Sequence, residues 1–275
     1  MTVDDTANEW LALEQKKVAF GAGGIVVKWS DKYAHSLVIA PWVTFGTLAD
    51  YSITSEKTDP KMGLYGDLTF DTQNATNAAV SHTVLVAVNL YDKAKDHQYQ
   101  YGYPDKGSII KKNAGTLILA GDNTYSNGTT VNGGTLLAAY DHALGTGTAS
   151  VGADGTLELM EGVSVTNAVT LAADATLLID GAETRTAAGT SVMGTITTPS
   201  TGTANLKVVG DLSDATGKVS IMLGALAEGA SVEALTLDAT ELTLPSAGWR
   251  ARLKAREGAL VLDVKNSSGM TLIVR

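Results

Sequence analysis

The 275-residue sequence contains no cysteine, which excludes disulfide bridges, thiol catalysis and cysteine-ligated zinc. Aromatic residues make up only 6% of the chain, and charged residues only 18%. No apolar run approaches the ~20 residues that a membrane-spanning helix needs. Residues 1–10 lack the positive start and apolar stretch of a signal peptide. The net charge of −9 makes a nucleic-acid backbone an unfavourable partner.

Glycine and threonine, by contrast, are abundant, with 29 and 34 residues. Together with the low charge, they favour strands and turns over helices. The composition changes near residue 110, because thirteen of the sixteen aromatic residues lie before that point. Between Lys112 and Arg185 there are eight acids and no Lys or Arg. We therefore expect an aromatic-rich N-terminal β region over residues 1–110 and a second region over 111–275.

A repeat of about twenty residues indicates the fold of the second region. A Gly/Ala-Thr-Leu/Ile triplet begins at Gly115, Gly134, Gly155, Ala175 and Gly194. The third residue of each triplet is a large aliphatic one, whereas the residue after it varies freely. The next residue is apolar in four copies, and Thr198 breaks the pattern in the fifth. Such alternation is typical of a strand with one buried face.

One such strand cannot bury its apolar face alone, but stacked repeats form a continuous aliphatic ladder. A period of about twenty residues suits one coil of a β-solenoid, whereas a propeller blade needs roughly 40 residues. We therefore expect an all-β chain with a β-solenoid over 111–275, on which either strand-rich N-terminal coils or a small β-domain is stacked. The repeat is clearest over 113–198, and less regular terminal coils follow over 199–275.

A solenoid end needs an atypical coil that covers the core, and the segment 249–257 is a candidate for it. This segment carries bases at alternate positions, namely Arg250, Arg252, Lys254 and Arg256. Two interpretations remain open, a basic binding patch and a solvated strand face. The alternation favours the solvated face.

A family resemblance is carried by residues 113–138, which read NAGTLILAGDNTYSNGTTVNGGTLLA. This stretch closely resembles the autotransporter-associated β-strand repeat of bacterial surface and secreted passenger proteins. The resemblance covers about residues 111–181, is weaker over 182–275 and is absent from 1–110. It implies a right-handed parallel β-helix displayed at or beyond a bacterial surface. It implies no catalytic residue, because these repeats are scaffold.

Two short stretches suggest an enzymatic alternative. Residues 68–72 read LTFDT and resemble the strand that leads to the catalytic aspartate of pepsin-like proteases, and residues 177–181, LLIDG, distantly resemble the second motif. Two aspartates share a proton in that chemistry, so the candidates are Asp71 and Asp180. Gln73 stands where the first motif expects glycine, and the repeat register puts Asp180 at an outward-facing strand end. Structural turn acids are the favoured interpretation, and a glycosidase carboxylate pair is the remaining alternative.

A second candidate site is a stripe of tyrosines in the N-terminal region. Tyr99, Tyr101 and Tyr103 alternate along the chain, so they share one face if the segment is extended. Tyrosine stacks on sugar rings through its apolar body and donates a hydrogen bond from its hydroxyl. His97 and Asp96 complete this candidate ligand-binding set. The alternative is a tyrosine-rich strand packed on the N-terminal sheet.

The leading hypothesis is a non-enzymatic β-helix, secreted or exposed on a bacterial surface, that binds host or matrix glycoproteins. One alternative is an extracellular hydrolase that acts on proteins or on glycoproteins such as mucin. Another is a purely structural stalk that positions a further domain. No cofactor or metal is expected, since the chain lacks H-E-x-x-H, G-x-x-x-x-G-K-[ST] and repeated G-G-x-G-x-D motifs.

Overall fold

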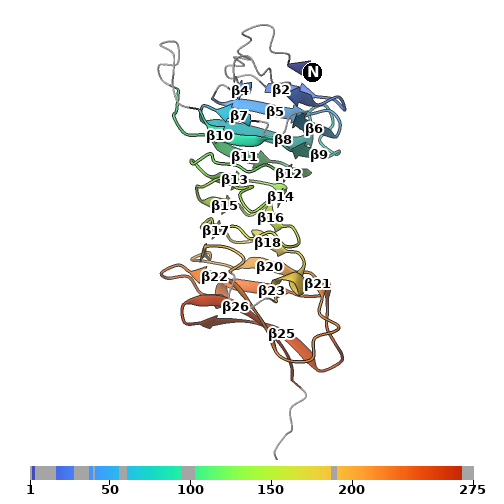
Figure 1. Cartoon of the computed structure of the whole chain (residues 1–275), viewed down its shortest axis with the longest axis vertical. Coiled ribbons are helices and arrows are strands. Elements are labelled where there is room, and N and C mark those ends of the chain that lie inside the picture. The colour runs from blue at the N-terminus through green and yellow to red at the C-terminus, as the bar shows by residue number, and fades with distance from the viewer. Residues whose placement is uncertain are drawn as a thin grey trace, which may run out of the picture.

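The computed structural model describes residues 2–3, 17–27, 37–39, 41–55, 61–93, 103–186 and 191–267. The chain winds into an elongated β-solenoid whose coils stack along the long axis (Figure 1). The strands of successive coils pair in parallel and build a ten-stranded and an eleven-stranded sheet. The expected all-β solenoid is confirmed.

The N-terminal coils carry strands on three sides. The ten-stranded sheet begins with β1 (Thr2–Val3), β3 (Ile25–Val27), β6 (Tyr51–Ser55) and β9 (Thr83–Val86). The eleven-stranded sheet begins with β2 (Lys17–Phe20), β5 (Val43–Thr47) and β8 (Asp67–Asn74). The third side is a short sheet of β4 (Leu37–Ile39), β7 (Lys61–Leu64) and β10 (Asn89–Asp92).

The central coils keep two strands each and close their third side with turns. The ten-stranded sheet continues with β12 (Thr116–Leu119), β14 (Gly134–Ala138), β16 (Gly155–Leu159) and β18 (Thr176–Ile179). The eleven-stranded sheet continues with β11 (Ser108–Lys112), β13 (Thr129–Val131), β15 (Ala149–Val151) and β17 (Val169–Leu171).

The C-terminal coils are less regular. The 3₁₀ helix η2 (Ala182–Arg185) precedes β19 (Thr195–Thr197), β20 (Ala204–Val208), β21 (Gly210–Asp211) and β22 (Val219–Leu226). A second 3₁₀ helix, η3 (Val232–Ala234), leads into β23 (Leu235–Asp238) and β24 (Leu242–Thr243). The last two strands are β25 (Trp249–Arg256) and β26 (Ala259–Asn266).

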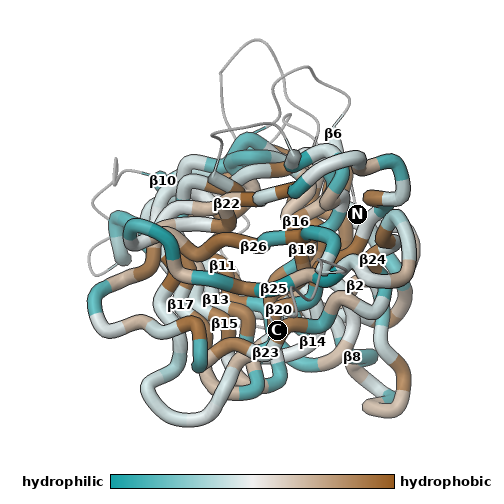
Figure 2. Tube along the Cα trace, turned by 90° about the horizontal axis from the view of Figure 1, so that it is seen from below, coloured by the Kyte–Doolittle hydropathy of each residue, from teal (hydrophilic) through white to brown (hydrophobic). Residues whose placement is uncertain are grey.

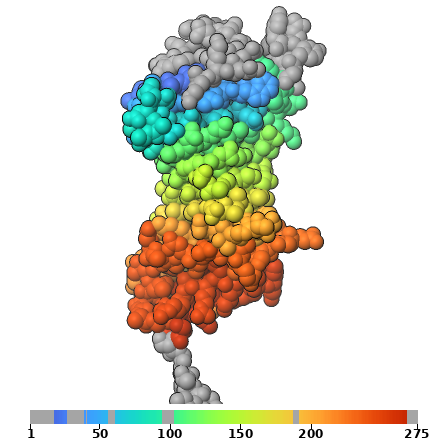
Figure 3. Space-filling model, turned by 180° about the vertical axis from the view of Figure 1, so that it is seen from behind, coloured from blue at the N-terminus to red at the C-terminus, as the bar shows by residue number. Residues whose placement is uncertain are grey.

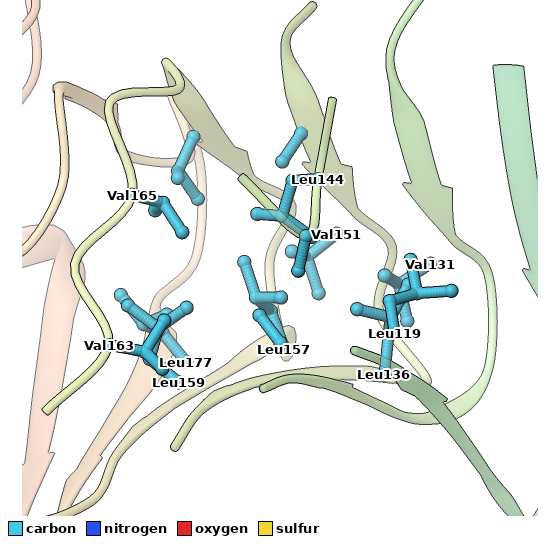
Figure 4. Packing of buried hydrophobic residues seen from close by; sticks show 14 of the residues in the cluster. Leu119, Val131, Leu136, Leu144, Val151, Leu157, Leu159, Val163, Val165 and Leu177 are labelled. Carbon is cyan, nitrogen blue, oxygen red and sulfur yellow. The ribbon is translucent and has the colours of Figure 1, made fainter. Parts of the chain in front are cut away.

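The core is a ladder of aliphatic side chains that the repeat places one above another. In the ten-stranded sheet the triplet leucines pair directly, and all are buried: Leu117, Leu136, Leu157 and Leu177. Figure 4 shows Leu136, Leu157 and Leu177 packed with neighbouring aliphatic side chains in the interior of the solenoid. Viewed along the long axis, the coils lie over one another, and hydrophilic residues are frequent in the outer loops (Figure 2).

The fifth triplet does not join this ladder. Leu206 of β20 takes the position beside Leu177, whereas Ile196 lies in β19 and pairs with Val169 in the other sheet. The cause is an insertion, because η2 and the residues after it lengthen the coil between β18 and β19. The triplet over 194–196 therefore keeps its sequence but changes sheet, and Thr198 marks the change in the sequence.

The compositional change near residue 110 is not a break in the fold. In the eleven-stranded sheet Asp71 of β8 pairs with Lys112 of β11, and in the ten-stranded sheet Val84 of β9 pairs with Leu117 of β12. The inward row of the first sheet changes chemistry instead, from aromatic to aliphatic. That row runs through Phe45, Phe70, Lys111, Val131 and Val151.

At the C-terminal end the sheet changes from parallel to antiparallel pairing. β26 pairs antiparallel with both β22 and β25, so a hairpin ends the eleven-stranded sheet. Glu257 and Gly258 connect the two hairpin strands with φ of 51° and 78°, as a type I′ turn requires. The segment 249–257 therefore lies in the terminal coil, and Figure 3 shows this end opposite the N-terminal coils.

The ladder predicts a contrast between two adjacent leucines. Leu136 is buried in the core, whereas Leu137 lies on the half-exposed outer face of the same strand. We expect Leu136→Ala to lower the free energy of unfolding by about 2–5 kcal/mol and Leu137→Ala by less than about 1 kcal/mol. Urea denaturation followed by circular dichroism measures both, and equal losses would contradict the register.

Candidate functional site

The two aspartates of the hydrolase hypothesis lie in different surroundings. Asp71 lies on β8 between the buried Phe70 and Thr72, and its Oδ1 accepts a hydrogen bond from Asn113 Nδ2 at 2.9 Å. Asp180 follows β18, and its Oδ1 accepts a hydrogen bond from the Gly181 amide at 2.7 Å. The Asp71 carboxylate therefore accepts a hydrogen bond from a turn side chain, and the Asp180 carboxylate accepts one from a turn amide.

These two aspartates are also far apart. Asp71 belongs to the coil of β8, and Asp180 to the coil of β17 and β18, four steps further along the eleven-stranded sheet. Strands in a sheet lie ~4.8 Å apart, so the separation along the axis is roughly 19 Å. A shared-proton pair needs carboxylates about 3 Å apart, and a glycosidase pair at most about 9.5 Å. The structure brings Asp71 and Asp180 together for neither chemistry.

The acid whose ionisation Asp180 does influence is Glu158. Burial, and then the charge of Asp180, raise the pKa of the half-buried Glu158, while Lys207 acts in the opposite direction. Lys207 itself forms an ion pair with Glu241 at 2.6 Å. These groups lie on the outer face of the ten-stranded sheet, where β16, β18 and β20 adjoin.

Most of the tyrosine stripe lies outside the described residues, namely Asp96, His97, Tyr99 and Tyr101. Tyr103, its last member, is half-buried, and its ring lies 5.6 Å from the buried ring of Tyr65. Tyr103 thus anchors one end of the stripe to the third side of the N-terminal coils. The binding role of the stripe stays a prediction.

An exposed tryptophan adjoins this anchor. Gly66, with φ of +103°, lies against both Pro41 and Pro104, so the corners that precede β5 and β11 meet there. Trp42 follows Pro41, is 49% exposed, and has a left-handed φ of 64°. A bulky residue rarely adopts that conformation without support from its surroundings, and the amide of Trp42 is held by the carbonyl of Asp67 at 3.0 Å. We call Trp42, Tyr65 and Tyr103 the aromatic corner.

Several acidic residues stabilise the turns. Asp92 Oδ1 accepts hydrogen bonds from the amides of Gly107 and Ser126, and Asp141 Oδ1 accepts one from the amide of Ser164. Asp122 is paired with His142 at 2.7 Å. In the described part of the chain, no group of three or more His, Cys, Asp or Glu residues is arranged to hold a metal ion.

A buried lysine was not anticipated. Lys111 is fully buried in the inward row between Phe70 and Val131, and its Nζ donates to the carbonyls of Asn113 and Gly133, each at 2.6 Å. It also donates to its neighbour's carbonyl at 3.2 Å. Its ammonium therefore holds together the corner that β11 shares with the next coil. The sequence did contain a signal for this burial, because Lys111 lies two residues after Ile109. Alternate residues of a strand share a face, and Ile109 is buried.

Comparison with known proteins identifies part of this region. Residues 109–138 match the model of the passenger-associated-transport-repeat, and this match supports an autotransporter passenger repeat. The chain contains a passenger-associated-transport-repeat. No curated protein and no solved structure gives a significant match. In the described residues, no helix has the length and apolar character to cross a bilayer.

The passenger-associated-transport-repeat spans β11 to β14 and includes the corner that the Lys111 ammonium stabilises. Its second triplet glycine, Gly134, has φ of +64°, and a Cβ there would lie 2.6 Å from Lys111 Nζ. A Cβ at Gly134 would also lie 2.4 Å from the Asn113 carbonyl oxygen and 2.5 Å from the Gly115 carbonyl oxygen, so glycine is required both by the backbone conformation and by the close approach of these carbonyls. The repeat thus encodes a corner as well as a ladder.

The buried lysine predicts a stability difference that depends on pH. Burial lowers the pKa of Lys111 to about 8, although Asp71 acts in the opposite direction. Between pH 8 and about 10.5 the unfolded chain retains a proton that the folded chain has released, so stability rises with pH in that window. We expect the free energy of unfolding of the wild type, relative to Lys111→Met, to increase by on the order of 2 kcal/mol from pH 8 to 10.5.

Urea denaturation of both proteins at half-unit pH intervals measures this difference. Taking the difference removes the contributions of the other titratable groups, which both proteins share. A difference that stays constant from pH 7 to 10.5 would show that the lysine does not change its protonation on folding.

Proposed function

We propose that this chain is a secreted or surface-displayed scaffold of the passenger type, which presents binding surfaces at the ends of a rigid β-solenoid. The observation that carries the proposal is the stacking of a passenger-associated-transport-repeat within one continuous pair of sheets. Each coil is held by the coils on either side, so the solenoid fixes the distance between its two ends.

The interior supports a scaffold more than an enzyme. The inward rows of the central coils are filled by buried aliphatic side chains, such as Leu119, Leu159 and Val151. Asp92 and Asp141 hold backbone amides, and Asp71 and Asp180 lie four coils apart. The hydrolase alternative therefore lacks the carboxylate pair on which it rests, that of Asp71 and Asp180.

Location in the cell tests the scaffold proposal. We expect antibodies against residues 113–186 to label intact cells of the encoding bacterium, or to detect the protein in the culture medium. Added protease should remove the label from intact cells without degrading a cytoplasmic marker. Recovery of the protein from the cytoplasmic fraction alone would refute display or secretion.

A second function, glycoprotein binding, is favoured by the aromatic corner. Trp42 is half-exposed and Tyr103 is half-buried at the corners that meet at Gly66. Exposed aromatic faces stack on the apolar faces of sugar rings, and the tyrosine hydroxyl adds a hydrogen bond. We infer that glycans of host or matrix glycoproteins bind at this corner.

Isothermal titration with mucin-type glycans tests this second function. We expect Trp42→Ala, and the combined alanine variant of Tyr99, Tyr101 and Tyr103, each to weaken binding at least tenfold. The matched control is Tyr140→Ala, because Tyr140 is 45% exposed but lies in the central coils. Absence of binding by the wild type, or equal binding by all variants, would refute glycan recognition at the corner.

A further inference from the structure

The outer face of the terminal hairpin concentrates positive charge. On β25 the alternate residues Trp249, Ala251 and Leu253 face the core side and are buried or half-buried. The residues between them are exposed and point away from the core: Arg250, Arg252, Lys254 and Arg256. The strand therefore presents a row of cations about 6.8 Å apart, since two residues of an antiparallel strand advance about that far.

Two further lysines extend this row across the sheet. Lys265 of β26 pairs in register with Arg250, so their side chains share a face. Lys218, next to β22, reaches the same face and contacts Asp263 at 3.2 Å. We call the six residues the cationic face: Lys218, Arg250, Arg252, Lys254, Arg256 and Lys265.

Three of the six cations contact the same carboxylate, that of Asp263. Asp263 is buried, accepts a hydrogen bond from Ser220 and forms ion pairs with Lys218, Lys254 and Arg256. Burial opposes its ionisation, but the hydrogen bonds and positive charges lower the pKa of Asp263 to about 2. Asp263 is therefore ionised at neutral pH, and within the part of the chain that the structure describes its ion pairs leave five of the six positive charges uncompensated.

The uncompensated charges gather beside a shallow hollow of about 240 Å³ lined by both hairpin strands. Arg250 donates only to its neighbour's carbonyl, and within the described ranges neither Arg252 nor Lys265 has a carboxylate partner. A guanidinium binds carboxylate, sulfate or phosphate through two parallel hydrogen bonds. The hollow therefore offers two arginine forks and a lysine to an anionic group.

We propose that the cationic face binds a linear anionic polysaccharide that carries sulfate or carboxylate groups along its length. A small anion would use one cation or two, whereas an extended polymer with charges on successive sugars matches a row of cations along an extended strand. The whole chain has a net charge of −9, so the positive charge of this face is a local exception. The central coils are acidic by contrast, since they contain no Lys or Arg between Lys112 and Arg185.

Edge protection, nucleic-acid binding and membrane binding account for the cationic face less well. Charged side chains on an edge strand discourage pairing with other chains, but Lys218 and Lys265 lie off the edge strand. Single-stranded nucleic acid needs exposed aromatic rings for base stacking, and Trp249 is only 7% exposed. Among the described residues the exposed large hydrophobic side chains all lie before residue 161, so the face has no apolar group to enter a lipid layer.

This inference goes beyond the scaffold proposal and does not depend on it, because it rests on the terminal hairpin alone. Its probe is heparin, a linear sulfated polysaccharide, measured by isothermal titration at several salt concentrations. We expect Arg250→Gln/Arg252→Gln to weaken heparin binding at least tenfold near 0.1 M salt. The slope of log K against log[salt] should fall by about two, or about one per charge removed.

The matched control is Lys106→Gln/Lys112→Gln, which removes two exposed charges from the central and N-terminal part of the solenoid. It should retain wild-type heparin affinity. The single variant Lys265→Gln tests the contribution of the cationic face to heparin affinity a second time, with only one substitution. Circular dichroism establishes that each variant is folded.

Phosphatidylserine vesicles and single-stranded DNA form two further arms, and both should bind more weakly than heparin by at least tenfold. Three outcomes overturn the proposal: no heparin binding at low salt, equal losses in the Arg250/Arg252 variant and its control, or binding to vesicles or DNA that matches heparin.

Discussion

A coil of this solenoid buries its apolar face only against the coils above and below it. The backbone hydrogen bonds of each strand also run to those neighbours, so one coil has little stability of its own. This dependence explains why Leu117, Leu136, Leu157 and Leu177 recur at nearly the same interval, since each must lie over the last. It also explains why the chain changes to an antiparallel hairpin at its C-terminal end, where no further coil follows in the described residues.

Stacking leaves the corners as the difficult part of the structure, because carbonyls and amides there lack strand partners. Buried or half-buried polar side chains supply them. Asn167 donates to the carbonyls of Gly145 and Gly147, and Arg185 donates to three carbonyls from the turns around it. Lys111 does the same inside the core. Many of the polar and acidic residues of the central coils thus stabilise the turns of the solenoid.

The sequence predicted the ladder well, because strand parity and a constant interval depend only on local residues. It failed at Ile196, since an insertion near η2 lengthens one coil and moves an unchanged triplet to the other sheet. The change of composition near residue 110 left open whether coils or a small β-domain precede it, and the sheets of the structure run through this point. There Phe70 is followed by Lys111 and Val131 in one inward row, so composition changes while pairing continues.

The candidate sites were harder to predict for a related reason. Whether Asp71 and Asp180 meet depends on the number of coils between them, which no local motif reveals. The bases of β25 were visible in the sequence, and the structure shows them on an exposed strand face as expected, but the residues opposite them could not be predicted. The strand register places Arg250 opposite Lys265 and Arg252 opposite Asp263. Only this register shows that the bases form a patch across two strands around one carboxylate.

The central claim is that one stack of coils runs through residue 110, and amide hydrogen exchange read by mass spectrometry tests it most directly. If the coils are continuous, peptides from β8 and β9 are protected to a similar degree as peptides from β11 and β12. They also lose protection together as urea is added, because each pair shares its hydrogen bonds. Fast exchange of residues 61–93 as a separate unit, while residues 108–138 stay protected, would contradict it.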